Sequence, residues 1–453
     1  MIGVDILPPG LQAFAALRAE DEPWLPRAFH SPQDEALMAG PGSVVIYSEA
    51  GGGRSAMLRM LKRRSLSRHK KAALWLPVDW RPNPPEGDER RTQMTWRRTL
   101  LESVALGALQ YFAWEPRRRE ALPAWGQAYL SAFILAFASP LLDVELMQLH
   151  EEAPEASRAW LRTLNRPEGD LLLPPETVRL FPLTQAIRRL VEVVKRAGVQ
   201  GVWVFVDGFE RWEADLDLDD VVIQGALQRF FSTLAYFDQP GFAFKMAAPL
   251  RWRRFLTRTH AVNTRRVAEF ELQWDVDDLT DIVALRLALA SEGRVTKLID
   301  LCDAPDVVTW LQRYGGGNPR RWLRWTGDLY RIYLEEGGER PLSIAMWRRL
   351  RTQLAPRLRI TPDKRVWVGS LEIKGLSESL YRVLEYLYVR DGEICSRKEL
   401  FTQAYRPGEA TYGWEGTMET VIWRLRQAIE PDPHHPIFLI TERGRGVRLA
   451  RTR

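Results

Sequence analysis

Short apolar runs alternate with longer amphipathic segments along about the first 290 residues of the chain. Each run has about the length of one strand, and the run at 202–206 contains no polar residue. Fully apolar strands are typical of a parallel sheet whose two faces are both covered by helices. The predicted strands lie at residues 43–47, 73–78, 202–206 and 241–247.

Helical patterns separate these strands. Residues 93–165 are mostly helical in pattern, residues 177–196 form an amphipathic helix with one apolar face, and a further helix is predicted at 221–235. Strands that alternate with helices predict a doubly wound α/β fold with a parallel sheet. The apolar face of the amphipathic helix consists of Leu180, Leu183, Ile187, Leu190 and Val194.

The chain continues with helical patterns at 279–291 and 304–335, and short alternating strands follow after about residue 350. A chain of 453 residues is too long for one ordinary core, so two or three domains are expected. The predicted domains are a lead-in at 1–36, an α/β domain at 37–290 with a helical insertion at about 93–165, a helical lid at 291–346 and an α+β domain at 347–453.

The composition, 45% hydrophobic and 27% charged, is that of a soluble globular protein. The longest apolar stretch, 132–142, is too short to span a bilayer, and the first residues lack the pattern of a signal peptide. Cys302 and Cys395 are far apart and do not indicate a disulfide framework. We therefore expect a cytoplasmic protein that has no membrane partner.

The net charge of +6 is unevenly distributed. Residues 347–453 contain 20 Lys and Arg against 13 Asp and Glu, so this quarter carries all the excess positive charge. Such asymmetry predicts a polyanion partner for the carboxyl-terminal end. The alternative is a basic surface that is only solvated.

The segment 48–55, Ser-Glu-Ala-Gly-Gly-Gly-Arg-Ser, lies between the first predicted strand and a helix. It has the layout of the phosphate-binding loop G-x-x-x-x-G-K-[ST], except that Ser48 replaces the first glycine and Arg54 replaces the lysine. Glycines here let several N–H groups face one phosphate, and the Ser55 hydroxyl is placed to bind Mg²⁺. The predicted phosphate cradle is Gly51, Gly52 and Gly53. The alternative is an ordinary glycine-rich turn.

The apolar run 202–206 is followed directly by Asp207, an arrangement of the Walker B type. We expect Asp207 to hold Mg²⁺ through water, and Glu210 to act as the base that activates the attacking water. The alternative is an Asp-Gly turn with a solvated Glu210.

Over residues 40–334 these motifs resemble the P-loop ATPases of the AAA+ and STAND type, including the Orc/Cdc6-like group. That resemblance implies ATP and Mg²⁺ as cofactors. It implies a polar sensor near the end of the strand at 241–247, for which Lys245 is the candidate. It also implies a second sensor at the start of a lid helix, where Arg320 would contact the γ-phosphate. The alternative for Arg320 is a solvated side chain.

Arg54 is the main departure from this family. A planar guanidinium is wider than the lysine ammonium that normally lies between the β- and γ-phosphates, although it can still pair with a phosphate. We therefore expect ATP binding with weak turnover.

The carboxyl-terminal segment predicts short strands, then three helices, then a hairpin. Ser377 is expected to cap the first helix, and Ser396 with Glu399 has the spacing of a capping box. This order resembles the OmpR/PhoB-type winged helix of response regulators. The helix at 417–430 resembles its recognition helix, and residues 440–449 resemble its wing.

The resemblance implies binding of double-stranded DNA through the third helix in the major groove and the wing in the neighbouring minor groove. Arg424 could meet guanine or phosphate. The candidate DNA-binding residues are Thr420, Trp423, Arg424, Arg426, Gln427, Arg443 and Arg445. In the alternative, the winged helix is a protein-interaction module and Trp423 contacts a partner protein.

Taken together, these features predict a nucleotide-dependent regulator in which an ATP-binding module, alone or with a protein partner or a second copy, places a DNA-binding domain. One alternative is a non-hydrolysing subunit of a larger assembly, such as a defence or mobile-element complex. Another is an active DNA-remodelling ATPase.

Overall fold

The chain forms two compact units, Arg18–Gln273 and Trp274–Arg453, the second of which includes the amino-terminal segment Met1–Leu17. They are described separately below. The computed structural model describes residues 10–15, 19–66, 74–85, 88–138, 141–165, 172–209, 212, 220–233, 236–354, 357–369, 371–407, 414–430, 433–434 and 436–450.

The first unit contains a five-stranded sheet in the order β2-β3-β4-β1-β5, and all of its neighbouring strands are parallel. The predicted parallel α/β sheet is therefore confirmed. The strands are β1 Ser43–Ser48, β2 Leu76–Trp80, β3 Val202–Val206, β4 Phe242–Pro249 and β5 Val267–Glu271.

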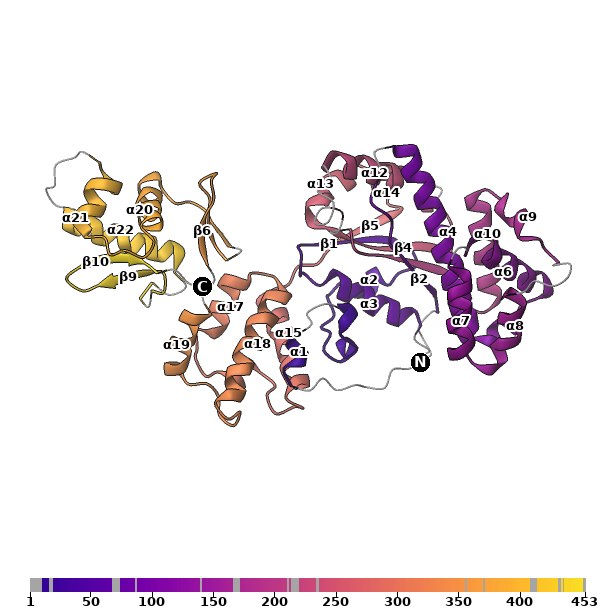
Figure 1. Ribbon diagram of the computed structural model, residues 1–453, viewed down its shortest axis with the longest axis horizontal. Coiled ribbons are helices and arrows are strands. Elements are labelled where there is room, and N and C mark those ends of the chain that lie inside the picture. The colour runs from indigo at the N-terminus through magenta and orange to yellow at the C-terminus, as the bar shows by residue number, and fades with distance from the viewer. Residues whose placement is uncertain are drawn as a thin grey trace. The chain divides into compact units, whose positions relative to one another are not determined.

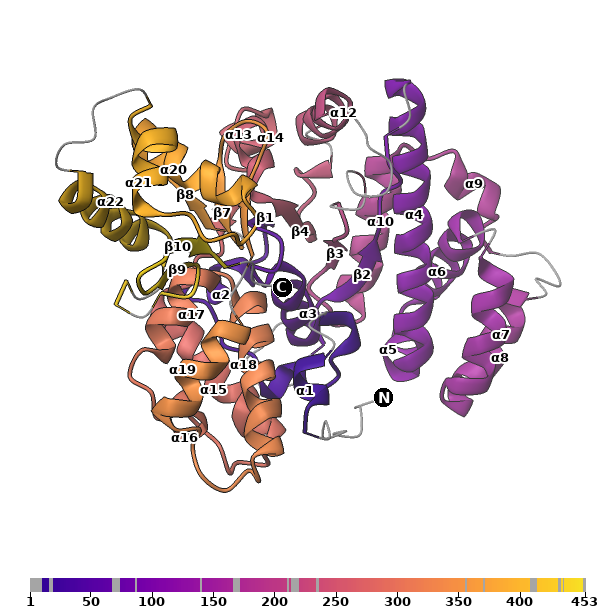
Figure 2. The ribbon, with the colours of Figure 1, turned by 60° about the vertical axis from the view of Figure 1, so that its left-hand side comes forward.

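The order of the strands decides which face each helix covers. From β1 the chain crosses to the β2 edge, whereas every later connection runs back in the opposite direction. Because such crossovers are right-handed, α3 (Arg54–Ser65) must lie on one face and the later helices on the other. Figures 1 and 2 show this arrangement, with α3 on one side of the sheet and α12 (Asp220–Ser232), α13 (Arg253–Leu256) and α14 (His260–Asn263) on the other.

Helices connect β2 to β3; they lie between Glu89 and Arg196, whereas the sequence placed the insertion at about 93–165. Its longest helix, α4, begins where the Asp88 carboxylate accepts from the Arg90 amide at 2.8 Å. The helices of the insertion are α4 Glu89–Trp114, α5 Pro116–Glu120, α6 Ala124–Phe137, α7 Leu142–Glu152, α8 Glu155–Asn165, α9 Pro175–Arg179 and α10 Leu183–Arg196.

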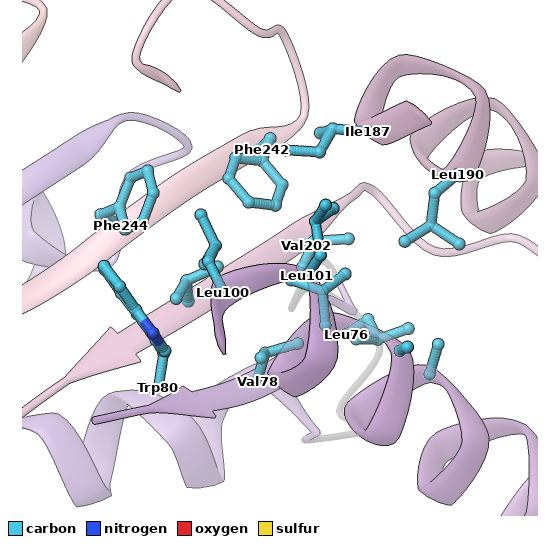
Figure 3. Packing of buried hydrophobic residues seen from close by; sticks show 14 of the residues in the cluster. Leu76, Val78, Trp80, Leu100, Leu101, Ile187, Leu190, Val202, Phe242 and Phe244 are labelled. Atoms are coloured by element: carbon cyan, nitrogen blue, oxygen red, sulfur yellow. The ribbon is translucent and has the colours of Figure 1, made fainter. Parts of the chain in front are cut away.

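Aromatic and aliphatic side chains fill the space between the sheet and this insertion. Figure 3 shows Trp80 of β2 beside Phe244 of β4, with leucines of α4 close to β2. The ring of Phe230, on α12, lies 5.6 Å from Trp80 and 5.5 Å from Phe244. Aromatic pairs at such distances add to the free energy gained from burial, so this cluster joins two strands and two helices into one core.

Short elements precede β1 and follow β4 in the first unit. They are η1 Ala19–Asp21, η2 Leu25–Arg27, α2 Glu35–Met38 and η4 Leu250–Trp252.

The second unit begins with a helical part. Its helices are α15 Val276–Ala290, α16 Leu298–Leu301, α17 Val307–Gly315, α18 Pro319–Glu335 and α19 Ile344–Gln353. The short helix α1, Gln12–Ala15, packs against α15 and α18.

Two contacts hold α1 in this helical part. Arg286 donates to the Ala13 carbonyl at 2.9 Å, and the Phe14 ring lies 5.8 Å from Tyr330. Gly327 permits the approach, because a Cβ atom there would lie 2.7 Å from Phe14. Residues 10–15 thus pack within the helical part of the second unit rather than in a separate lead-in. The helix α15 also lies in this unit, whereas the sequence placed all of it in the α/β domain.

The carboxyl-terminal part contains two small antiparallel sheets and three helical segments. Ser377 caps its first helix, and Ser396 with Glu399 forms the predicted capping box. The elements are β6 Leu358–Ile360, β7 Val366–Val368, β8 Leu371–Ile373, α20 Glu378–Val389, α21 Arg397–Glu399, the π-helical turn η5 Leu400–Tyr405, α22 Trp414–Ile429, β9 Leu439–Glu442 and β10 Gly446–Leu449.

Within the described ranges, no helix combines the length and the apolar character that crossing a membrane requires.

The contact between α4 and β2 yields a stability prediction. A Cβ atom on Gly107 would lie 2.9 Å from Val78, a stiff and buried strand residue, so Gly107→Ala should lower the free energy of unfolding by about 1–3 kcal/mol. Gly126→Ala is the matched control, because its Cβ atom would meet ordinary contacts at 3.5 Å and should stabilise α6 by up to about 1 kcal/mol. Urea denaturation measures both changes, and equal effects would contradict the close packing.

Candidate nucleotide loop and nucleic-acid interface

The loop between β1 and α3 needs glycine for two physical reasons. Gly51 and Gly53 have φ angles of +85° and +96°, which lie in the left-handed region. Gly52 has no room for a side chain, because a Cβ atom would lie 2.5 Å from the Ser48 hydroxyl. Its amide donates to the Glu49 carbonyl at 3.0 Å, which closes the turn.

The loop lies at the carboxyl edge of the sheet, where the chain direction reverses. The connection from β1 leads toward β2, and the connection from β4, its neighbour, leads toward β5. In open α/β sheets, ligands bind outside the carboxyl ends of strands at such a switch point. The amino terminus of the twelve-residue helix α3 adds the positive end of its dipole there.

Arg54 and Ser55 are the first two residues of α3. Only 7% of the Arg54 surface is exposed, so its guanidinium packs within the protein. Ser55 is half-buried on the next position. The helix thus starts where the phosphate-loop pattern requires. Arg54, which takes the place of the motif's lysine, is buried.

Asp207 follows β3 directly and is half-buried. One strand, β4, lies between β3 and β1, so Asp207 is about 10 Å across the sheet from the loop strand. Its carboxylate accepts from the Gly208 amide at 2.8 Å, and Gly208 has φ +90°. These are features of the Asp-Gly turn alternative, and they leave Asp207 at the same edge as the loop. Glu210 lies outside the described residues.

The structure corrects the placement of Lys245. This residue pairs with Val44, in the amino-terminal half of β1. Its amine donates to the carbonyls of Met38, Gly40 and Gly42 at 2.9, 2.7 and 2.8 Å. Those carbonyls precede β1, so the amine points to the amino edge of the sheet, opposite the loop. A sensor position near the nucleotide does not fit this geometry.

Burial lowers the pKa of Lys245 to about 7. The three carbonyl acceptors oppose that shift, because only the ammonium form has three hydrogens to donate. The Trp203 ring, 4.5 Å from Nζ, also favours the charged form. Lys245 therefore ties the segment before β1 to the centre of the sheet.

The strand β4 continues two residues beyond its predicted end, and this changes which side chains reach the loop edge. Pro249 pairs with Ser48, so the following turn begins beside the loop. Arg251 is exposed on that turn, and Arg253 pairs with Glu271 of β5. The sequence interpretation missed these arginines because it predicted that the strand ends at Ala247. Pro249, which follows the apolar run, could have indicated the true end of the strand.

Arg320 occupies the first turn of α18 and is exposed. The Asn318 side chain caps this helix by accepting from the Arg321 amide at 3.3 Å. Arg320 belongs to the second unit, and its contact with a γ-phosphate stays a prediction.

The helix α22 buries one face and exposes the other. Its inner face consists of Met418, Val421, Ile422, Leu425 and Ile429. Its exposed positions are Glu415, Gly416, Glu419, Thr420, Trp423, Arg424 and Gln427. Thr420, Trp423, Arg424 and Gln427 are therefore outward, as the sequence predicts. The Trp423 ring is 36% exposed and lies 5.0 Å from His434.

The hairpin of β9 and β10 follows α22 and turns at residues 443–445. Arg443 and Arg445 are exposed at this turn, and neither guanidinium forms an ion pair with a described residue. Arg448, by contrast, pairs with Glu442 at 2.7 Å across the hairpin. The two arginines at the tip are thus available to an external anion.

Residues 373–449 match the family described as "Transcriptional regulatory protein, C terminal". Relatives named sensory transduction protein RegX3 are 35% identical over 69 residues, which is 15% of this chain. The matched part is 30% of the Mycobacterium tuberculosis protein and 29% of the Mycolicibacterium smegmatis protein, so the chain spans about a third of their length.

The carboxyl-terminal domain is an OmpR/PhoB-type winged helix. A solved structure, the Klebsiella pneumoniae RstA DNA-binding domain in complex with the RstA box, is 25% identical. That match covers 21% of this chain and 93% of the RstA chain, with a TM-score of 0.19.

The winged helix uses Arg426 within its own fold, which differs from the expected role at a DNA flank. Arg426 donates to the Leu439 carbonyl at 2.8 and 3.1 Å and to the Thr441 hydroxyl at 2.7 Å. These contacts fix the first strand of the wing to the recognition helix, so Arg426 is a structural residue. Partial burial lowers the pKa of Arg426 from its ordinary value.

Glu430, fully buried after the last turn of α22, completes this attachment. Its carboxylate accepts from the amides of Ile437, Phe438 and Leu439 at 2.6 to 3.1 Å. Burial raises the pKa of Glu430, while the three amides and Arg426 oppose the rise. The sequence interpretation missed this residue, because an acid at a helix end is commonly solvated.

The role of Lys245 can be tested by removing its charge. Lys245→Met leaves three carbonyls without their donor, and we expect it to lower the free energy of unfolding of the α/β unit by about 2–4 kcal/mol. Hydrogen exchange of the β1 and β4 amides measures the change locally. Lys195→Met, at an exposed lysine of α10, is the control and should leave exchange unaltered. A silent Lys245→Met would contradict the structural role.

Proposed function

We propose that this protein is a transcription regulator that binds duplex DNA through its winged helix and binds ATP with Mg²⁺ at the loop of its α/β unit. The observation that carries the DNA part is the outward surface of α22 together with the exposed arginines at the wing tip. The match of residues 373–449 to the family described as "Transcriptional regulatory protein, C terminal" supports this part.

The distribution of charge on the winged helix supports this use. Arg424, Arg443 and Arg445 are exposed, and none forms an ion pair with a described residue. Arginine side chains at a recognition helix suit guanine or phosphate, and arginines at a wing suit a narrow groove or the sugar–phosphate backbone. The basic balance of residues 347–453 adds attraction toward a polyanion.

The DNA proposal predicts the salt dependence of binding. The double variant Arg443→Ala with Arg445→Ala should lower duplex affinity about tenfold and reduce the slope of log K against log salt by about 2, because two phosphate contacts are lost. Fluorescence anisotropy over a salt series on a duplex pool measures both quantities. Arg365→Ala, whose guanidinium pairs with Asp363 at 2.8 Å, is the control. Weak titrations without salt dependence would reject DNA binding.

The nucleotide part is supported by the convergence of three features at one edge of the sheet. The glycine loop has left-handed backbone angles at Gly51 and Gly53, α3 starts at its end, and Asp207 follows β3 at the same edge. Arg54, enclosed beside the loop, would pair with a phosphate without matching the position of a lysine ammonium. Slow hydrolysis or none is the expected consequence.

The nucleotide proposal predicts binding in calorimetric titrations with ATP and Mg²⁺. Asp207→Asn should weaken the Mg²⁺-dependent affinity by about 10- to 100-fold, since a carboxylate that holds the metal through water is lost. Asp238→Asn, whose carboxylate pairs with Arg266 at the opposite edge of the sheet, is the matched control. Absence of ATP binding by the unaltered protein would end this half of the proposal. Fast turnover that Arg54→Ala abolishes would contradict only the expectation of weak hydrolysis.

One observation favours a second function, in which the winged helix docks a protein. The amino-terminal half of the outward face of α22 carries Glu415 and Glu419, which repel phosphate, and Trp423 exposes an apolar ring. Arg397 neutralises Glu419 in part, at 3.2 Å. In that case the protein would still bind ATP through its α/β unit, but its winged helix would not bind duplex DNA. The salt series above therefore separates the two functions.

ATP can control DNA binding only by preferring one conformation of the protein over another. The effect is reciprocal, so DNA must change ATP affinity by the same factor. Stimulation of hydrolysis by DNA would instead favour the remodelling ATPase.

A further inference from the structure

The carboxyl end of the recognition helix is capped by a residue from the helical part of the same unit. Arg313 of α17 donates from Nη2 to the carbonyl of Ala428 at 3.0 Å and to that of Gln427 at 3.4 Å. The last carbonyls of a helix have no partners within it, and a cation there also complements the helix dipole. This cap is supplied from more than one hundred residues away in the sequence.

Arg313 is mounted on a rigid helix. Trp310, three residues before it, is buried, and its ring lies 4.9 Å from Trp325 and 5.5 Å from Trp347. At the start of α17, Asp306 pairs at 3.0 Å with Arg351 of α19. The guanidinium is therefore presented to α22 from a helix that aromatic packing and an ion pair hold in place.

The other side of the same helix end belongs to the wing. Glu430 binds the first amides of β9, and Arg426 binds the Leu439 carbonyl, so the end of α22 and the start of the wing form one hydrogen-bonded group. Tyr314, the neighbour of Arg313, is buried close to this group. Burial is the main cause that raises its pKa, and the Glu430 carboxylate adds to the rise.

We propose that Arg313 is a positioning residue for DNA binding: by capping α22 at the point where the wing attaches, it holds recognition helix and wing in the geometry that reads two neighbouring grooves. The DNA readout of this inference rests on the proposed function. The cap itself is a contact within the protein and does not depend on DNA.

The physical reason is preorganisation. A helix end that frays must be ordered again when DNA binds, and this ordering lowers affinity. Arg313 donates to protein carbonyls, so the cap itself requires no phosphate contact. Its loss should therefore weaken DNA binding at every salt concentration by the same factor. A lost phosphate contact would instead flatten the salt dependence.

The experiment compares three variants of the full chain: Arg313→Ala, Arg313→Lys and Arg324→Ala. Arg324 is an exposed arginine of α18 and controls for the loss of one positive charge. Hydrogen exchange by mass spectrometry follows the last turn of α22 and β9, and anisotropy follows duplex affinity over a salt series. We expect Arg313→Ala to speed exchange at both segments and to lower affinity about tenfold with an unchanged salt slope. Arg313→Lys should recover part of both effects, and Arg324→Ala should alter exchange at neither segment.

Three results would overturn the inference. A salt slope that falls by about 1 in Arg313→Ala would make this residue a phosphate contact. Tighter DNA binding by the same variant would make the cap a restraint on the winged helix. Unchanged exchange at α22 and β9 would show that Arg313 does not hold the helix end. If the unaltered protein binds no DNA, the proposed function fails, and the exchange measurement still decides whether the cap exists.

Discussion

The position of β4 between the loop strand β1 and the acid-ended strand β3 is the constraint on which the α/β unit depends. It forces the chain to leave β1 in one direction and to leave every later strand in the other. Because the crossovers are right-handed, α3 is the one crossover helix among the described residues that covers its face, and its amino terminus meets the sheet at the reversal. The glycine loop, the Asp207 carboxylate and the turn with Arg251 then share one edge. The placement of the candidate nucleotide loop at this edge is a consequence of topology more than of any single residue.

Two buried charges perform comparable structural work in the two units. The Lys245 ammonium binds three carbonyls before β1, and the Glu430 carboxylate binds three amides before and within β9. In each case a charge satisfies backbone groups that could not reach a neighbouring strand. Each also carries a desolvation cost, which its full set of hydrogen bonds offsets. Both residues join a loop to the element that holds the candidate site.

The winged helix shows how the surface proposed to read DNA can be separated from the residues that support it. Arg424 and the wing-tip arginines face outward, whereas Arg426, only two residues from Arg424, is directed to the Leu439 carbonyl. One helix can do both because successive positions differ by about 100° around its axis. The Arg313 cap adds support from the helical part. The carboxyl end of α22 is therefore held by contacts with α17 and with the wing.

The sequence by itself determined the parallel α/β class, the loop after β1, the capped helices and the winged helix, because apolar periodicity, glycine and capping residues act over a few neighbouring positions. The outward residues of α22 followed from the same periodicity. Only the tertiary structure decided that Lys245 faces the amino edge, that Arg426 serves the wing and that α1 packs on α15 and α18. Long side chains such as Lys and Arg choose among acceptors that are brought close by chain folding, and a linear pattern contains no information on those distances. The glycine motif at residues 48–55 is thus local, while the partners of its charged neighbours are set by the fold.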